Sequence, residues 1–389
     1  MSKAPVSDID LFSDEARLDL YPRYSALRQL GSVVHLPEYG VYALPRYAEV
    51  RDVLGDWERY SSAEGVTLNR ELNRDLKGIM LASDPPEHTA MRRAFGRPLR
   101  PERMRELQPR IEAEAERVVQ TLVAWGEFDA VTELAQYLPM TVVSDLVGLG
   151  EHGRSHMLRW ARATWEAQGW PNERVAAAGP EIGEFISFVM DDGLPGKLAP
   201  GGWAAQLFDA ADRGEIPREK CPFMMIDYVT PSLDTTISAV SSAVCLFAEY
   251  PAQWDLLRKN PELVPHSINE VLRLESPVQQ FTRTVTSDHT LAGYDLSAGS
   301  EVMMLYGSAN RDERKYTDPD RFDIRRMPSD HLAFGRGEHA CIGMQLARLE
   351  MSALLNALIP RVERFQVIDA SPLLSNVLKG WRSLRVRVS

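Results

Sequence analysis

Apolar residues recur every three or four positions along most of the chain, which is the period of an amphipathic α-helix. The segment 101–126 shows this clearly, because Met104, Leu107 and Ile111 fall on one face of a helix. Comparable periodicity predicts helices over 135–149, 154–168, 174–192, 218–249, 251–258, 264–275 and 342–358. The pattern is therefore typical of a mainly helical protein.

Two segments alternate in the way that strands do. Residues 32–45 flank a Glu-Tyr-Gly turn, and residues 289–306 predict a hairpin followed by a strand. Three stretches, 61–88, 194–202 and 312–340, fit neither period, and long irregular loops inside a compact protein are commonly functional. We therefore expect a mainly α fold with a small β-sheet region.

The composition is that of an ordinary globular protein. Of the 389 residues, 44 % are apolar and 25 % are charged, which excludes a disordered or fibrous chain. No linker rich in Ser, Gly or Pro interrupts the interior of the sequence, and no repeat with a period of about 20–50 residues is visible. These observations predict a single domain over residues 1–389.

Charge and cysteine content narrow the partners and the compartment. The net charge of −11 argues against a nucleic-acid partner. No apolar run approaches the roughly 18 residues needed to span a bilayer, so we expect no membrane association. The three cysteines, Cys221, Cys245 and Cys341, do not make a disulfide framework, which favours a cytoplasmic protein. Cys221 and Cys245 lie in apolar helical settings and are interpreted as packing residues.

The passage with the most chemical information is HLAFGRGEHACIGMQLARLEM, residues 331–351. A glycine-rich loop leads to Cys341, and a periodic helix follows directly, so the sulfur would lie at a helix N-terminus where a thiolate is stabilised. The alternative is a buried free cysteine behind a glycine turn. The pattern F-G-x-G-x-H-x-C-x-G argues against it, because its six fixed positions would coincide by chance roughly once in 10⁸ positions.

This motif resembles that of the cytochrome P-450 family, in which the cysteine is the axial thiolate ligand of haem iron. The resemblance extends over nearly the whole chain, from LYPRYSALRQLG (20–31) to SNVLKGWRSLRVRV (375–388), and implies the cytochrome P-450 fold. It implies that Cys341 binds the iron of haem b, with O2 as co-substrate. The cofactor-binding residues in this passage would be Phe334, Gly335, His339, Cys341 and Gly343.

A second passage, HSINEVLRLESP, places Glu270 and Arg273 on one helical face. Glu-x-x-Arg alone is not specific, and its other occurrences are best explained as solvated pairs. The 68 positions from Arg273 to Cys341, with YTDPDRFDIRR between them, are what resembles the family. The resemblance implies that Glu270, Arg273 and Arg321 form a structural ion-pair network behind the cysteine loop. The solvated pairs are Glu71/Arg74, Glu102/Arg105 and Glu114/Arg117.

A third passage, residues 221–251, is an apolar helix interrupted by Pro231 and neighbouring hydroxyl residues. Proline inside a helix removes a hydrogen bond and opens the helix. The resemblance makes Asp234 and Thr235 the catalytic acid and alcohol that supply protons during oxygen activation. The family usually has two small residues where this chain has Pro231 and Ser232. The resemblance therefore does not determine the shape of the helix break beside the oxygen-binding face of haem. The alternative is a proline-kinked core helix.

A fourth group lies near DPPEHTAMRRAFGRPLR. His88 and Arg92 are four positions apart, so both could reach one anionic group from a single helical face. The resemblance assigns these two residues, together with Arg283 and His339, to the haem propionates. On its own, His88 would more often be a surface histidine.

The same stretch is unusually basic. Six arginines lie between positions 88 and 105 of an acidic chain, with only one acidic residue among them. They are interpreted either as a solvated helix face or as a docking patch for an acidic electron carrier. These residues are Arg92, Arg93, Arg97, Arg100, Arg103 and Arg105.

The resemblance implies a haem-thiolate monooxygenase that inserts one oxygen atom into a C–H bond of a small hydrophobic substrate. Electrons would come from NAD(P)H through a ferredoxin or flavodoxin and a reductase. A haem-thiolate sensor would not need Asp234 and Thr235, and a peroxide-driven peroxygenase usually lacks that pair. Both remain alternatives.

The substrate is predicted less sharply. Phrases such as ESPVQQFTRTVT resemble family members that hydroxylate small aromatic acids or O-demethylate methoxy-phenols, and related phrases occur in hydroxylases that tailor macrolides and terpenes. The expected pocket includes the loop 61–88 and residues near 160–180, with an apolar lining and a few polar groups. Its further lining residues would be Val229, Leu233, Thr236, Val278, Gln279 and Phe281.

Overall fold

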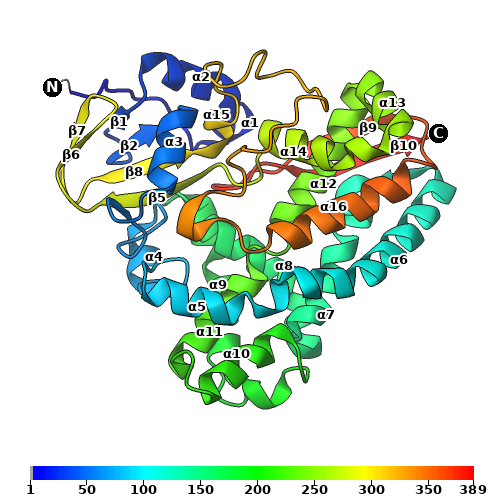
Figure 1. The fold of residues 1–389 in the computed structure, drawn as a ribbon, viewed down its shortest axis with the longest axis horizontal. Coiled ribbons are helices and arrows are strands. Elements are labelled where there is room, and N and C mark those ends of the chain that lie inside the picture. Colours follow the sequence, from blue (N-terminus) through cyan, green and yellow to red (C-terminus); the bar gives the residue numbers. More distant parts are fainter. Residues whose placement is uncertain (1–2) are drawn as a thin grey trace.

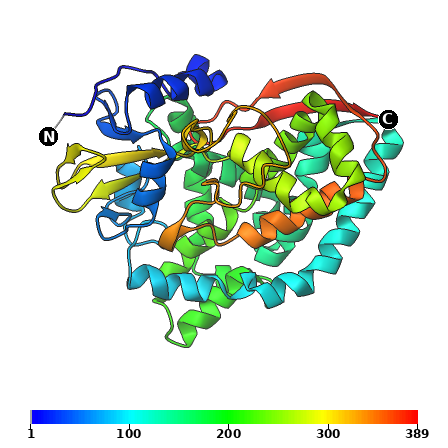
Figure 2. The ribbon, with the colours of Figure 1, turned by 45° about the horizontal axis from the view of Figure 1, so that its top comes forward.

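The computed structural model describes residues 3–389 and separates the main sheet from most of the helices (Figures 1 and 2). The N-terminal helices and the largest sheet lie together on one side, and the longer helices fill the rest of the molecule. The predicted mainly helical class with a small β-sheet region is therefore confirmed. The helices are α1 (Asp14–Leu18), α2 (Leu20–Leu30), α3 (Tyr47–Leu54), α4 (Arg70–Asp75), α5 (Glu87–Phe95), α6 (Pro101–Trp125), α7 (Ser144–Val147), α8 (Gly150–Ala167), α9 (Glu173–Val189), α10 (Trp203–Asp212), α11 (Cys221–Val229), α12 (Asp234–Glu249), α13 (Pro251–Lys259), α14 (Val264–Leu274), α15 (Tyr306–Ala309) and α16 (Met344–Leu358).

The long helix α6 shows how the sequence sets a helix and its buried face. It begins at Pro101, whose missing N–H costs nothing in a first turn, and it ends before Gly126, which takes a φ of 76°. Met104 and Ile111 are buried as predicted, and α6 packs along α16. The helices share one large apolar core. Across residues 3–389, no helix is both long and apolar enough to cross a bilayer.

The largest sheet has five strands in the order β1-β2-β8-β5-β3. Strand β2 is parallel to β8, and the other neighbours are antiparallel. This sheet places Arg283 in the interior of the molecule, opposite Val302. The strands are β1 (Val34–Leu36), β2 (Val41–Leu44), β3 (Tyr60–Ser61), β5 (Gln280–Val285) and β8 (Glu301–Leu305).

Two smaller sheets complete the β structure. One has the order β4-β10-β9, and the other is the hairpin of β6 and β7. The strands predicted within 32–45 and 289–306 are confirmed, because they form β1, β2, β6, β7 and β8. The remaining strands are β4 (Glu127–Asp129), β6 (His289–Leu291), β7 (Tyr294–Leu296), β9 (Phe365–Pro372) and β10 (Trp381–Val388).

Two predicted segments differ from the structure. The helix expected over 135–149 is not a regular α-helix, since π-helical turns at Ala130–Ala135 and Pro139–Val143 precede α7. Pro139 has no N–H to donate to the preceding turn, which accounts for the irregular hydrogen bonding. The stretch 61–88 is less irregular than expected, because Asn69 caps the short helix α4 with its side chain.

The helix predicted over 218–249 is divided. Helix α11 ends at Val229 and α12 begins at Asp234, with Pro231 in the gap. The interruption expected from the proline is confirmed. It matters for the site because it separates the backbone at Asp234 from the helix before it.

Candidate active site

Backbone hydrogen bonds close the loop that holds Cys341. The Cys341 N–H donates to the carbonyl of Phe334 at 2.7 Å, and the Ala340 N–H donates to that of Gly337 at 3.0 Å. Gly337 has a φ of 70°, and a Cβ at this position would lie 2.3 Å from the carbonyl oxygen of Leu54. Only glycine fits there, so the loop is fixed against the end of α3.

The sulfur of Cys341 lies beside the first residues of α16. The N–H groups of Gly343 and Met344 donate to it and favour the thiolate, as the sequence predicts, and the Arg92 cation acts in the same direction. Although the residue is exposed to solvent, protein atoms desolvate the sulfur, and this burial raises the pKa of Cys341 overall. The expectation of a lowered thiol pKa is therefore wrong for the chain alone. A coordinated cation deprotonates such a thiol.

Four predicted residues meet next to this loop and are called the cationic cluster: His88, Arg92, Arg283 and His339. The rings of His88 and His339 lie 4.1 Å apart. Arg92 donates to the carbonyl of Ala340, the neighbour of Cys341. Burial and the nearby arginines lower the pKa of His88 to about 4 and that of His339 to about 2. Both imidazoles are therefore neutral at pH 7.

The cationic cluster is incomplete within the chain. Among residues 3–389, neither ring nitrogen of His88 nor Nε2 of His339 has a hydrogen-bond partner, although these atoms are buried. The nearby carboxylate of Asp84 is occupied by Ser61 and Ser62. Buried polar groups are normally paired, so this cluster fits an anionic ligand that the chain does not supply. Haem, with an iron for Cys341 and carboxylates for the cluster, satisfies both requirements.

The predicted ion pair of Glu270 and Arg273 is present and fully buried. Arg273 donates to both carboxylate oxygens at 2.7 and 2.9 Å, and also to the carbonyls of Asn310 and Pro319. Two of the pairs interpreted as solvated are exposed, for example Glu102 with Arg105, whereas Glu114 of the third is half buried and also accepts from Tyr137. Burial therefore distinguishes the structural pair from surface pairs with the same spacing.

The third member of this network is Arg326, and the expectation for Arg321 is wrong. The Nε of Arg326 lies 3.1 Å from Glu270 Oε1. The loop turns the side chain of Arg321 into solvent, and only its carbonyl accepts from Arg273 and Arg326. We call Glu270, Arg273 and Arg326 the ion-pair network.

The predicted acid and alcohol follow the helix break. Asp234 is buried, and its Oδ1 accepts from Nε of Arg162 at 3.2 Å. Burial raises the pKa of Asp234 to about 6, although Arg162 opposes the shift. The hydroxyl of Thr235 donates to the carbonyl of Pro231 at 2.8 Å. This carboxyl therefore titrates near neutral pH, one residue from a hydroxyl on the broken helix.

Asp234 also borders a cavity of about 640 Å³ between α8, α9 and the segment before β10. Arg162 lines the same cavity, and its side chain is half exposed. The carboxyl of Asp234 therefore has a route to solvent through its partner arginine.

Most of the predicted pocket lining is wrong. Val229 and Leu233 have no exposed surface and Thr236 is buried, so all three face the core behind the helix break. Gln279 is also fully buried and donates to the carbonyl of Ser276. The accessible positions along this broken helix include Phe223, Asp227, Pro231 and Thr235, which repeat every four residues.

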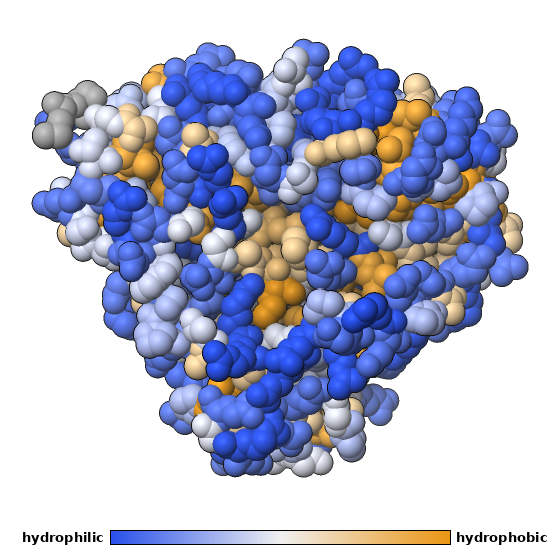
Figure 3. Space-filling view, viewed as in Figure 1, coloured by the Kyte–Doolittle hydropathy of each residue, from blue (hydrophilic) through white to orange (hydrophobic). Residues whose placement is uncertain are grey.

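Val278 and Phe281 are half buried and pack with Trp165. Figure 3 shows apolar side chains in a recess at the centre of the face on which α5 and the start of α16 meet. The apolar surroundings expected of a hydrophobic pocket are therefore present near the site, although the lining differs from the prediction.

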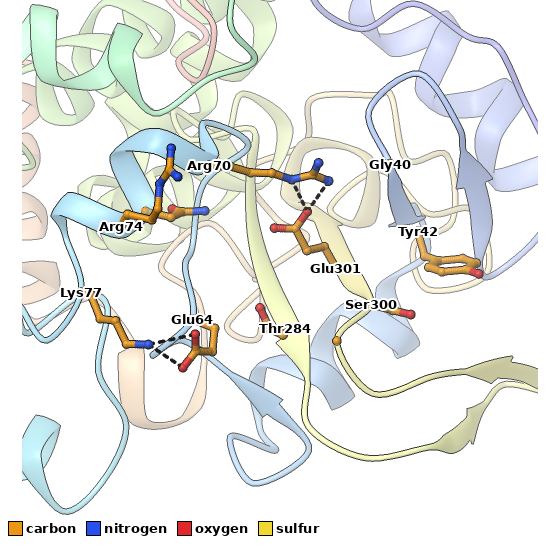
Figure 4. Close-up of a pocket in the computed structure, with 11 residues that line it drawn as sticks. Gly40, Tyr42, Glu64, Arg70, Arg74, Lys77, Thr284, Ser300 and Glu301 are labelled. Atoms are coloured by element: carbon orange, nitrogen blue, oxygen red, sulfur yellow. Dashed lines mark hydrogen bonds and ion pairs between the residues drawn. The ribbon is translucent and has the colours of Figure 1, made fainter.

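A second pocket, of about 430 Å³, lies beside α4 and the largest sheet. Figure 4 shows that two ion pairs cross it, Arg70 with Glu301 and Lys77 with Glu64, each at 2.9 Å. Five of its lining residues belong to the predicted substrate loop 61–88, but none of the site residues predicted one by one lines it. Its exposed charges describe a polar surface groove.

Known proteins resemble this chain over its whole length. The profile of the family described as Cytochrome P-450 matches residues 224–371. Cytochrome P-450 CYP199A2 of Rhodopseudomonas palustris is 37 % identical over 99 % of this chain and 95 % of its own length. Linalool 8-monooxygenase of Pseudomonas putida is 28 % identical over 99 % of both chains. The crystal structure of CalO2 superposes with a TM-score of 0.85 at 29 % identity, covering 98 % of each chain.

Proposed function

Because this chain belongs to the cytochrome P-450 family of monooxygenases, we propose that it is a haem-thiolate enzyme in which Cys341 is the iron ligand. The observation that supports this assignment most strongly is the combination of a sulfur held by two N–H groups with an adjacent cationic cluster whose ring nitrogens lack partners within residues 3–389. The family relationship implies haem iron, O2 and redox partners, and haem b is the form proposed here.

When bound, haem supplies the iron at which O2 is activated. The chain supplies orientation and charge. Gly343 and Met344 donate to the sulfur of Cys341, and the cationic cluster would hold the two carboxylates of haem.

Protons are proposed to reach the site through Asp234 and Thr235. Burial raises the pKa of Asp234 to about 6, so this carboxyl can exchange protons near neutral pH, and Arg162 links it to the cavity beside α8 and α9. The hydroxyl of Thr235 donates to Pro231 and can accept a proton in turn. In the family, two small residues usually open the helix beside this hydroxyl. In this chain we propose that the break at Pro231 opens it.

Electrons are proposed to come from NAD(P)H through a reductase and a ferredoxin or flavodoxin in the cytoplasm. Arg97, Arg103 and Arg105 already pair with glutamates, whereas Arg93 and Arg100 are exposed. Arg92 on the same helix as Arg93 contacts the loop of Cys341, so an acidic carrier on this surface would lie close to the iron ligand.

The substrate is proposed to be a small hydrophobic molecule, an aromatic acid or a methoxy-phenol, which is hydroxylated or O-demethylated. Phe281 is half buried, packs beside Trp165 with ring centroids 6.3 Å apart, and offers an aromatic surface of the right kind. Terpene or macrolide tailoring is the competing class, and a panel of ligands in the spectral titration below separates them.

The absorption spectrum of the purified protein, reduced and exposed to carbon monoxide, tests the central assignment. Thiolate ligation by Cys341 gives a strongly red-shifted Soret band, and the Cys341→His variant is expected to give the band of histidine-ligated haem. A wild-type band at the histidine position, or no bound haem, would refute the assignment.

The role of Thr235 is tested separately, by measuring how much of the oxygen consumed appears as product and how much as hydrogen peroxide. In Thr235→Ala, oxygen consumption is expected to continue while product falls and hydrogen peroxide rises, because the hydroxyl that passes protons is gone. Ser242, a buried hydroxyl residue two turns further along α12, provides the control variant Ser242→Ala. Unchanged product yield and peroxide release in Thr235→Ala would refute this proton route and favour a peroxide-driven enzyme, whereas a wild type that forms no product at all would favour a sensor.

A further inference from the structure

One carboxyl in α11 has no role in the function proposed above. Asp227 interrupts the apolar run Met224–Val229, and its Oδ2 is buried without a hydrogen-bond partner among the described residues. An unpaired polar atom in such surroundings costs stability. Unlike an oxygen closed in by the core, this oxygen belongs to a partly open residue and is available to a partner from outside the chain.

The orientation of α11 follows from its contacts on the other side. Cys221 donates to the carbonyl of Leu207 in α10, and the ring of Tyr228 stacks on Phe95 of α5 at 3.8 Å. These two residues, seven positions apart, define the face that packs on α10 and α5. By helical geometry Asp227 lies well away from the Cys221 side of the helix.

The accessible stripe along the broken helix includes Asp227. Phe223, Asp227, Pro231 and Thr235 are spaced by four and are the partly open positions of this face, whereas Val229 and Leu233 are closed. The bond from the Thr235 hydroxyl to the carbonyl of Pro231 shows that the spacing of one turn is kept across the second half of the break. Asp227 is therefore two turns from Thr235 on the same side of the helix.

The loop 61–88 meets this stripe at its other end. Lys220, seven positions before Asp227, donates to the carbonyl of Gly78. The loop then continues to Ser83, whose backbone is bonded to His339 of the cationic cluster. Asp227 is thus placed between the expected substrate loop and Thr235.

We propose that Asp227 anchors the substrate by accepting a hydrogen bond from a donor group, an ammonium or a hydroxyl, at the end of an otherwise apolar molecule. This inference rests on the proposed function, since it places the anchor on the side of the helix that carries Thr235. It deepens that function by choosing between the two substrate classes. Ionised Asp227 would repel a substrate carboxylate, which has no proton to donate, so methoxy-phenols and aromatic amines are favoured over aromatic acids at a pH above the pKa of Asp227.

The electrostatic surroundings agree with this geometry. Burial alone raises the pKa of Asp227 to about 7, and no charged side chain in residues 3–389 contributes to the shift. Asp234 differs in this respect, because Arg162 partly offsets its burial. Asp227 is therefore free to pair with a ligand, whereas Asp234 already has a partner.

The test uses the haem-loaded enzyme and four ligands of one shape, 4-methoxybenzylamine, 4-methoxyphenol, 4-methoxytoluene and 4-methoxybenzoate. Dissociation constants come from the spin-state titration and, independently, from equilibrium dialysis. We expect the amine and the phenol to bind at least about tenfold more tightly than the toluene, with the benzoate weakest, because a charge-assisted hydrogen bond is involved.

Two variants locate the effect. In Asp227→Leu the preference for donors should disappear and the toluene should bind best, while Asp227→Asn should keep part of the phenol affinity and lose the amine preference. Leu removes a buried unpaired carboxyl, so this variant is expected to fold. Asp209→Asn, which makes the same charge change at an exposed position of α10, controls for net charge.

The outcomes separate the inference from the function beneath it. A donor preference that survives in Asp227→Leu, or tightest binding of the benzoate by the wild type, would overturn the anchor while the red-shifted carbon monoxide band still supports the haem-thiolate enzyme. Loss of that band in the wild type would instead remove the proposed function itself.

Discussion

The ion-pair network and the cationic cluster are both buried and both built around arginine, yet only the first is complete. The carboxylate of Glu270 accepts hydrogen bonds from Arg273 and Arg326. Arg273 also donates to backbone carbonyls. The cationic cluster gathers two arginines around two neutral histidines, and its ring nitrogens have no partner within residues 3–389. The donors and acceptors of the ion-pair network are paired within the chain, so this network stabilises the fold. The cationic cluster has unpaired nitrogens, so it fits a binding site.

The largest effect is expected from breaking the complete network. Glu270→Gln leaves Arg273 as a buried cation without its counter-ion, which should lower the free energy of unfolding by about 3–5 kcal/mol. Urea denaturation measures this difference. The matched control is Glu102→Gln, whose exposed pair with Arg105 is worth about 0–1 kcal/mol. Equal losses in the two variants would mean that burial does not distinguish them.

Substitution in the cationic cluster should affect haem binding more than it affects the stability of the haem-free chain. Arg283→Met removes one cation from the cluster, so haem binding is expected to weaken by about 1.5–3 kcal/mol through the loss of a charged hydrogen bond. The haem-free chain should lose less stability than the haem-loaded one, because Arg283 donates only to the carbonyl of Thr282 in the contacts observed. Haem transfer to an acceptor protein and urea denaturation of both forms provide the measurements. A larger loss in the haem-free form would make the cluster structural.

A buried carboxyl without any cation sharpens the comparison through its pH dependence. Glu350 in α16 is 1 % exposed, and burial raises its pKa to about 8. Its pKa in the folded state is above the unfolded value, so the folded state binds the extra proton and stability falls as the pH rises from about 5 to 8. Glu350→Gln should remove about 1–3 kcal/mol of this pH-dependent loss. Parallel stability curves for the wild type and the variant would contradict it.

The smallest expected change in stability distinguishes Arg326, which belongs to the ion-pair network, from Arg321, which does not. Arg326→Ala removes a side chain bound to Glu270 and should cost about 1–2 kcal/mol, whereas Arg321→Ala removes an exposed side chain and should stay within about 0.5 kcal/mol. Thermal unfolding of the pair decides the assignment. The reverse order would restore Arg321 to the network.

The sequence predicts the cysteine loop better than the pocket lining beside the helix break for a physical reason. The loop is specified by neighbours in the chain, because glycines, His339 and Cys341 have fixed spacing and the backbone there can close in few ways. The helix periods of α6 and α16 are equally local. Such features can be read from one sequence with little reference to distant residues.

The features that the sequence did not predict depend on contacts between distant residues and on the direction in which side chains point from a loop or a helix. Arg162 meets Asp234 from another helix, and nothing near either residue indicates that pairing. The choice of Arg326 over Arg321 depends on which way a loop turns its side chains. The break at Pro231 determines which face of the helix is open, and the expected lining at Val229 and Leu233 fell on the closed face. Asp227 did carry a signal, as a lone carboxylate in an apolar run.

The closed loop of Cys341 also bears on how the enzyme matures. Its backbone bonds and the close approach of Gly337 to Leu54 use only groups of the chain, so we expect this loop to close on folding without haem. Cofactor uptake by the folded chain is then an encounter followed by ligation, without a slow rearrangement of this loop. We expect the uptake rate to rise in proportion to the haem concentration and not to reach a ceiling set by loop closure.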